Sequence, residues 1–250
     1  MRPGQDDFYV GYGDRSPPEL AVWLRRVTAT TLIAGVFAAV LVALGQKPLP
    51  DARFEFGTTG EWSGFLVADP FPALLLASGV GNRRLHLVDP GKHGAHDTLA
   101  PFTDRWVTLS GTLIQRGEQR MLELVPGSAR VREDQAAPPV PDPISDLGVH
   151  YVEGEVVGSK CFLGVMNPGS GTVHRACARL CLQGGIPPML AVRQPDGSRV
   201  GWVLTGPDGT QAGDTWLDFA AEAVGVTGRV VRVGSTTFLH VDPLNIRRLD

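Results

Sequence analysis

The stretch "VTLSGTLIQRGEQRMLELVP" at residues 107–126 decides the fold, because a version of it occurs twice in the chain. It aligns without a gap with "VGVTGRVVRVGSTTFLHVDP" at residues 224–243, 117 positions later. Each copy alternates apolar and polar residues on both sides of a central glycine, which is the pattern of two strands joined by a tight turn. A repeated hairpin predicts two copies of one small β-domain.

Weaker similarities extend this repeat towards the N-terminus. "SGFLVADPFPALLL" (63–76) parallels "EGEVVGSKCFLGVM" (153–166), and "RRLHLVD" (83–89) parallels "SRVGWVL" (198–204). Each copy therefore reads as two strands, a loop with some helix, and a strand pair. The offset grows from 90 to 117 residues, so the second copy holds an insert, which we predict after Met166 and before the strand near residue 200.

Small glycine-punctuated units of five strands resemble OB-fold barrels, including those of exported bacterial proteins. The resemblance implies a mainly β protein with a first OB-like barrel at 55–131, a proline-rich linker at 132–149 and a second barrel at 150–250. OB barrels often bind oligonucleotides or sugars on a strand face. Neither copy has a basic groove with stacking aromatics, and the net charge is −3. We therefore expect no nucleic acid and no clear small-molecule substrate.

Residues 27–45 contain no charge and no proline, and as a helix they can cross a hydrocarbon core about 30 Å thick. A cleaved signal peptide is the alternative. Positive charge is concentrated before the segment, at Arg15, Arg25 and Arg26. The positive-inside rule predicts a single-pass protein of a bacterial inner membrane, with the tail 1–26 in the cytoplasm and the barrels in the periplasm.

The tail carries the aromatic stretch "DDFYVGYG" at residues 6–13. It is either a solvated tail with interfacial aromatics or, as we favour, a strip that docks on a neighbouring membrane-protein subunit.

All three cysteines of the chain lie within residues 161–188, together with one of its six histidines. The segment "TVHRACARLCLQGG" (172–185) predicts a short helix that is capped by Thr172 and ended by two glycines. Its His174, Cys177 and Cys181 are spaced i, i+3 and i+7, which places them on one face. We expect Cys161, at the end of the preceding strand, to fold back onto that face.

Three sulfurs and one imidazole form a ligand set for a soft or borderline metal, either zinc or the iron of an iron–sulfur cluster. His174 and Cys181 are separated by about 10 Å of helix rise, which favours the wider ligand spacing of a two-iron cluster. A disulfide from Cys161 to Cys177 or Cys181 is an alternative. A haem with Met166 and His174 as axial ligands is another.

Cys161, the H-x-x-C-A-x-x-C run at 174–181 and the G-G-I-P turn at 184–187 resemble a domain of small exported bacterial proteins of unknown role. The resemblance implies a shared site and gives no activity. A second-tier metal site is predicted at His93 and His96, in "DPGKHGAH" (89–96).

These features predict an accessory or electron-transfer subunit of a membrane redox complex, tethered as Rieske-type subunits are, although the Rieske Cys-x-His pair is missing. The alternatives are a metal-handling or assembly protein, a thiol–disulfide enzyme, and a scaffold subunit with a structural zinc or disulfide. No catalytic triad, phosphate loop or nucleotide fingerprint is present in the sequence, so we do not expect an enzyme on its own.

Overall fold

The computed structural model describes residues 17–46, 52–78, 81–135, 137–140 and 142–249. The chain divides into two units, Met1–Pro48 and Leu49–Asp250. The aromatic stretch 6–13 lies outside the described residues.

The first unit contains one apolar helix, α1 (Pro18–Gly45). Its proline stands in the first turn, where the missing N–H costs no hydrogen bond, and its interior is rich in alanine, leucine and valine. The 28 residues give a length of about 42 Å. The mean hydropathy of its most apolar window is 2.3, and that window is entirely exposed. The helix is therefore long and apolar enough to cross a membrane, and it extends back past the predicted segment 27–45.

The first barrel of the second unit closes through five strands. They are β2 (Gly60–Val67), β3 (Ala73–Ser78), β4 (Gly81–Val88), β5 (Trp106–Arg116) and β6 (Gln119–Leu124). Strands β2–β3, β3–β4, β5–β6 and β2–β5 pair antiparallel, and β4 pairs parallel with β6. The short helices α2 (His96–Leu99) and η1 (Ala100–Phe102) fill the connection from β4 to β5. Two short strands, β1 (Ala52–Phe54) and β7 (Arg130–Val131), add to β5.

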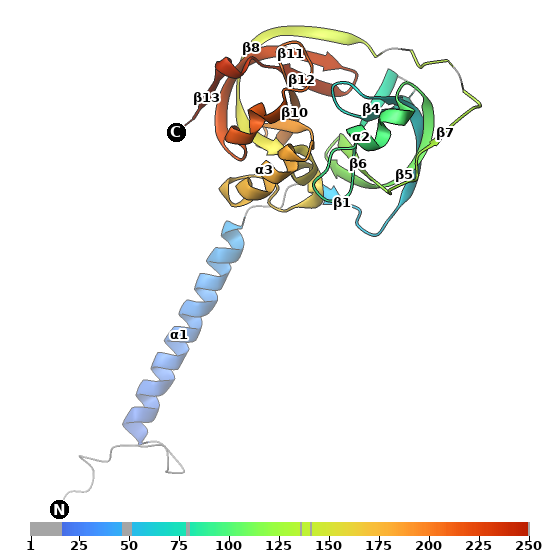
Figure 1. Cartoon of the computed structure of the whole chain (residues 1–250). Coiled ribbons are helices and arrows are strands. Elements are labelled where there is room, and N and C mark those ends of the chain that lie inside the picture. Colours follow the sequence, from blue (N-terminus) through green and yellow to red (C-terminus); the bar gives the residue numbers. More distant parts are fainter. Residues whose placement is uncertain (1–16, 47–51, 79–80, 136, 141, 250) are drawn as a thin grey trace, which may run out of the picture. The chain divides into compact units, whose positions relative to one another are not determined.

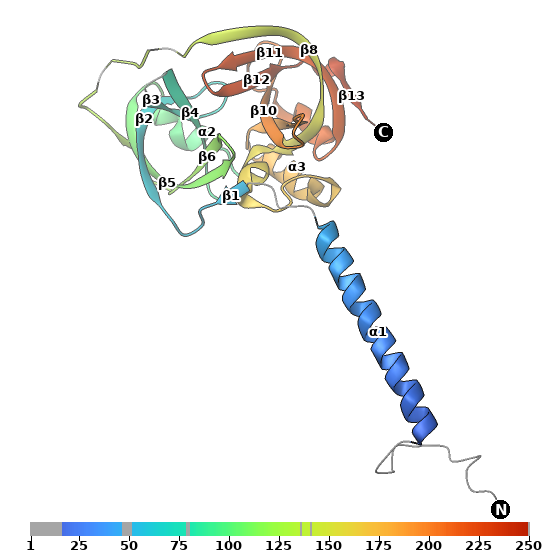
Figure 2. The same ribbon diagram turned by 180° about the vertical axis from the view of Figure 1, so that it is seen from behind.

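The second barrel repeats this ring. Its strands are β8 (Ile144–Gly158), β9 (Pro188–Arg193), β10 (Arg199–Thr205), β11 (Ala223–Val233) and β12 (Thr236–His240). All pairs are again antiparallel except β10–β12, which is parallel. The 3₁₀ helix η4 (Gly213–Phe219) connects β10 to β11; η5 (Pro243–Asn245) and β13 (Ile246–Arg248) end the described chain. The predicted fold class is confirmed: a mainly β protein with two closed OB-like barrels (Figures 1 and 2).

The repeated stretches form the hairpins β5–β6 and β11–β12. Their turn glycines, Gly117 and Gly234, have φ values of +53° and +56°, in the left-handed region that other residues rarely adopt. The glycine at this position of the repeat therefore forms the same kind of turn in both copies.

One part of the repeat alignment is wrong. Residues 163–166, which align with 73–76, were expected to form a strand, and Cys161 was expected at the end of the strand before the insert. Instead β8 ends at Gly158, and Cys161–Val165 forms a π-helical turn, η2. The strand equivalent to β3 is β9, so the insert spans residues 159–187 instead of beginning after Met166. A short apolar run matches a strand and a buried helical turn equally well, and here it packs against other elements instead of joining a sheet.

Each barrel has its own apolar core, and a third core lies between the two barrels. The third core contains side chains of the first barrel, such as Ile114 and Met121, beside Phe162, Leu163 and Met189 of the second. The η2 turn is thus buried at the junction of the barrels. Arg116 donates a hydrogen bond to the Phe162 carbonyl at 2.7 Å and stacks 4.2 Å above its ring.

Candidate metal centre

The insert that follows β8 consists of three short helical pieces. They are η2, the 3₁₀ turn η3 (Thr172–His174) and the helix α3 (Arg175–Gln183). Helix α3 contains no β-branched residue, and alanine, arginine and leucine favour its formation. It stops at Gly184, and Gly185 follows with a left-handed φ of +86°. The prediction that Thr172 caps the helix is wrong, because Thr172 opens η3 and makes no capping hydrogen bond.

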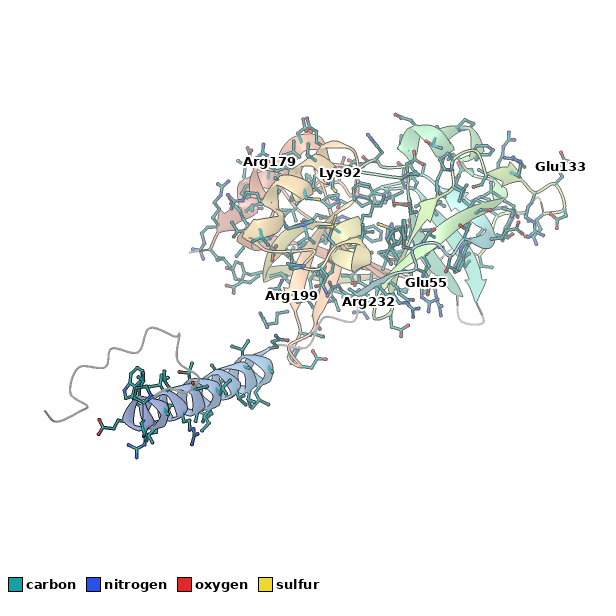
Figure 3. The ribbon with its side chains drawn as sticks, turned by 90° about the horizontal axis from the view of Figure 1, so that it is seen from below. Glu55, Lys92, Glu133, Arg179, Arg199 and Arg232 are labelled. Carbon is teal, nitrogen blue, oxygen red and sulfur yellow. The ribbon has the colours of Figure 1, made fainter. Side chains whose placement is uncertain are left out.

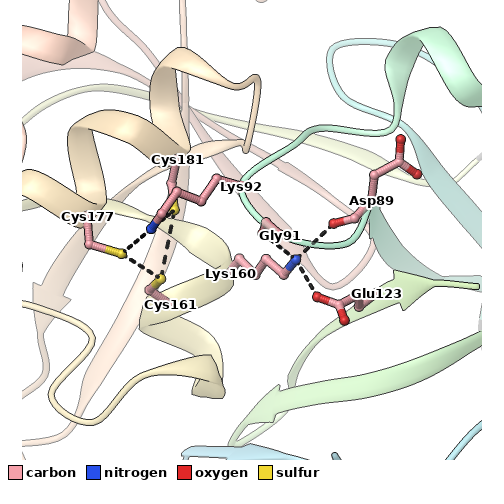
Figure 4. Close-up of polar contacts among 8 residues, drawn as sticks. All are labelled: Asp89, Gly91, Lys92, Glu123, Lys160, Cys161, Cys177 and Cys181. Carbon is pink, nitrogen blue, oxygen red and sulfur yellow. Dashed lines mark hydrogen bonds and ion pairs between the residues drawn. The ribbon is translucent and has the colours of Figure 1, made fainter.

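The structure brings the three cysteines of the insert together (Figure 4). Their Sγ atoms all lie within 4.8 Å of one another. The Cys161–Cys177 distance is 3.8 Å, and the Cys161–Cys181 distance is 3.9 Å. Cys161 and Cys181 are buried, Cys177 is half-buried, and all three are free thiols. Cys161 reaches the cluster from η2, while the other two project from the same face of α3.

These spacings suit a single metal ion. A tetrahedral zinc site with Zn–S bonds of about 2.3 Å separates its sulfurs by about 3.8 Å. Disulfide sulfurs are only about 2.05 Å apart. The three cysteines could therefore hold a metal ion such as zinc without rearrangement of the backbone.

Lys92 of the first barrel lies beside the three sulfurs. Its Nζ donates to Cys177 Sγ at 2.7 Å and lies 4.0 Å from Cys181 Sγ. The loop that carries it is held against the insert, since Gly94 N donates to the Gly184 carbonyl at 2.8 Å. The site is thus built at the junction of the two barrels, which the sequence did not reveal; the only signal was the lysine in "GKHG".

The cluster is charged in the metal-free protein. The hydrogen bond from Cys161, with help from the charge of Lys92, lowers the pKa of Cys181 to about 6. The same thiol contact, together with burial, raises the pKa of Cys161 above its usual range. The hydrogen bond to Cys177 and the nearby thiols raise the pKa of Lys92. A thiolate therefore faces an ammonium at neutral pH, and the thiolate is the form that binds metals.

A second lysine, Lys160, was also missed by the sequence analysis. Its side chain is 2% exposed, and its Nζ donates to the carbonyls of Asp89 and Gly91 at 2.8 and 2.7 Å and forms an ion pair with Glu123 (Figure 4). These partners belong to the first barrel, so Lys160 fixes the loop that carries Lys92. Its position next to Cys161 was the only hint in the sequence.

The predicted histidine lies apart from the sulfurs. His174 is buried at the start of α3, and its ring is outside the group of ligand atoms that lie within 4.8 Å of one another. Its Nε2 has no hydrogen-bond partner in the described part of the chain. Burial and the charge of Lys92 lower its pKa, so the imidazole is neutral, as a metal ligand must be. Its role as the fourth ligand stays a prediction.

The other predicted ligands lie outside the cluster. His93 and His96 are exposed on the first barrel, and the side chain of Met166 is 44% exposed. A metal site at the two histidines and a haem between Met166 and His174 stay predictions.

Comparisons with protein-family models, with curated proteins and with solved structures find no match for this chain. The resemblance to exported bacterial domains therefore stays a prediction.

Proposed function

We propose that this chain is a membrane-anchored metal-binding protein that holds one soft or borderline ion at Cys161, Cys177 and Cys181. The observation that carries this proposal is the pair of sulfur distances, 3.8 and 3.9 Å, from three free thiols that lie on two separate elements. Helix α1 would provide the anchor, and the arginines that precede its apolar part support an N-terminus in the cytoplasm and barrels in the periplasm.

The compact site supports a single ion over an iron–sulfur cluster. Cysteine ligands of a two-iron cluster are divided between two irons, whereas these three sulfurs all lie within 4.8 Å. Among the functions considered, this favours metal handling or an accessory role in a membrane complex. Electron transfer for a redox complex would then depend on the identity of the ion.

A second candidate function, thiol–disulfide exchange, is favoured by the pKa of Cys181, which is about 6. Cys181 itself is buried, and the half-buried Cys177 is the sulfur of this cluster that a substrate can reach. Attack of Cys177 on a substrate disulfide would release one substrate thiol. Cys161, 3.8 Å from Cys177, would then displace the second substrate thiol and leave a Cys161–Cys177 disulfide. Two electrons would pass from the protein to the substrate.

Metal analysis of the full chain separates these functions. The protein would be purified in detergent without air or chelators, then examined by elemental analysis and absorption spectroscopy. We expect about one metal ion per chain and no inorganic sulfide, with loss of the ion in Cys161→Ser. Ser159→Ala is the matched control, because it changes a buried neighbour and keeps all three thiols. A metal-free chain with a Cys161–Cys177 disulfide would support exchange, and iron with sulfide would support a cluster.

A further inference from the structure

The number of ligands at the site can be read from the side chains around the sulfurs. Among the described residues, the group of ligand atoms that lie within 4.8 Å of one another contains three sulfurs and no nitrogen or oxygen. Structural zinc sites are almost always closed by four protein ligands. Here the space beside Cys177 and Cys181 holds the Lys92 ammonium, at 2.7 and 4.0 Å. An ammonium has no lone pair, so it cannot act as the fourth ligand.

The sulfur triangle has room for an ion in its own plane. Two of its sides are 3.8 and 3.9 Å, and the third is at most 4.8 Å. The point equidistant from the three sulfurs then lies at most about 2.5 Å from each, which is within the range of a metal–thiolate bond. A tetrahedral ion would stand out of this plane and face a fourth ligand. A three-coordinate ion needs none.

The charge of Lys92 and the burial of the cysteines both favour a monovalent ion with three ligands. The Lys92 ammonium repels a divalent ion twice as strongly as a monovalent one at the same distance. It also offsets the negative charge that remains when three thiolates bind a monovalent ion. Cys161 and Cys181 are 4% and 1% exposed, which limits the access of water as an additional ligand. Among the ions that thiolates select, cuprous copper is the monovalent one.

We infer that the ion is monovalent copper, bound by the three sulfurs of Cys161, Cys177 and Cys181, with Lys92 excluding a fourth ligand. The inference rests on the proposed function and specifies its ion. Lys92 acts here as a selectivity-determining residue contributed by the first barrel, so the preference for copper over zinc requires both barrels.

The first test is the coordination of the bound ion. The reduced, metal-free full chain in detergent would receive one equivalent each of Cu(I) and Zn(II) without air, and the bound ion would be examined by X-ray absorption. We expect copper with three sulfur neighbours and no nitrogen or oxygen. Bound zinc, or copper with two sulfurs or with a nitrogen ligand, would overturn the inference and leave the proposed metal site intact. Failure of both ions to bind would overturn both proposals.

The second test changes the lysine. Lys92→Leu removes the charge and adds no ligand atom, so we expect the Zn(II) affinity to rise about tenfold and the Cu(I) affinity to change less. Arg179→Leu is the matched control, because it removes one positive charge from α3 at a side chain that pairs with Asp218. Figure 3 shows Arg179 on the second barrel and Lys92 at the boundary with the first. An unchanged ratio of the two affinities in Lys92→Leu would contradict the role of Lys92.

Discussion

The two barrels share one strand order, and their largest difference is one connection. Between β2 and β3 the first barrel uses residues 68–72, whereas between β8 and β9 the second uses residues 159–187. The short connection turns the chain and adds Phe71 to the core between the barrels, while the long one adds several residues to that core and holds all three cysteines. The barrel is therefore a scaffold common to both copies, and the three candidate cysteine ligands all lie in one insert of the second copy.

The barrels also contribute differently to the site. The second barrel supplies the sulfurs, and the first supplies the charge of Lys92. Lys160 of the second barrel donates hydrogen bonds to two backbone carbonyls in the loop of the first barrel that carries Lys92. Each barrel therefore places a lysine among the acceptors of the other, and substitutions at these contacts test whether the two repeats depend on each other.

We expect the largest effect from Lys160→Met. The substitution leaves the Glu123 carboxylate and two backbone carbonyls without their ammonium in a buried place. Removal of one partner from a buried ion pair costs about 3 kcal/mol or more, so the free energy of unfolding should fall by about that amount. Urea unfolding of the full chain in detergent, followed by tryptophan fluorescence, measures it.

Arg229→Met is the matched control for this prediction. Its ion pair with Asp146 lies within the second barrel, and the two side chains are 59% and 50% exposed. Exposed pairs of this kind contribute about 0–1 kcal/mol. If both variants lost the same small amount, the lysine exchange would not hold the barrels together.

A smaller loss is expected where the two barrels meet backbone to backbone. A Cβ atom at Gly184 would lie 1.8 Å from the Lys92 carbonyl oxygen, which belongs to the opposing loop. Gly184→Ala should therefore push the loop away, lower the free energy of unfolding by about 2 kcal/mol and weaken the hydrogen bond from Lys92 to Cys177. Urea unfolding gives the first quantity, and the pH at which the cluster ionises reports the second.

Gly206→Ala provides the comparison within the second barrel. The nearest atom to its added Cβ would be Asp208 Oδ1 at 3.2 Å, the end of a flexible side chain that can move aside. We expect a change below about 0.5 kcal/mol. A comparable loss in both glycine variants would show that the close contact at Gly184 is relieved at little cost.

The sequence predicted the features that depend on short-range pattern. The hairpins followed from alternation around Gly117 and Gly234, the apolar helix from the run 27–45, and the helix α3 from its composition. The shared face of Cys177 and Cys181 followed from helical spacing. Each of these needs only residues that are close in the chain.

The contacts between barrels could not be predicted in this way. Lys92 and Cys177 are 85 positions apart, and Lys160 and Gly91 are 69 apart. Nothing in the spacing of either lysine distinguishes it from a solvated surface residue, which is the usual position of lysine. The apolar run at Cys161–Val165 was misassigned for the related reason that its burial comes from the other barrel. Packing between residues that are far apart in the chain determines both the lysine contacts and the conformation of Cys161–Val165.

The smallest effect concerns the charge of the metal-free cluster. Because the pKa of Cys181 is lowered to about 6 in the folded chain, its thiolate stabilises the fold above the usual thiol pKa of about 8.5. This contribution is lost as the pH falls from about 8.5 through about 6. The raised pKa of Cys161 contributes stability below the usual thiol pKa, so its contribution is constant in this range. The metal-free protein should therefore become less stable on acidification from pH 8.5 to 6.

The pKa of Cys181 shows whether Lys92 of the first barrel acts on the sulfurs of the second. Lys92→Leu removes a nearby positive charge, so the pKa of Cys181 should rise by about one unit. The ultraviolet absorbance of the thiolate, followed against pH in the metal-free chain, measures this midpoint, and Cys181→Ser identifies the sulfur that titrates. A midpoint near the usual thiol value in the unmodified chain would mean that Lys92 does not act on the sulfurs in solution. The second barrel would then carry its site without help from the first, and the two repeats would be joined only by packing.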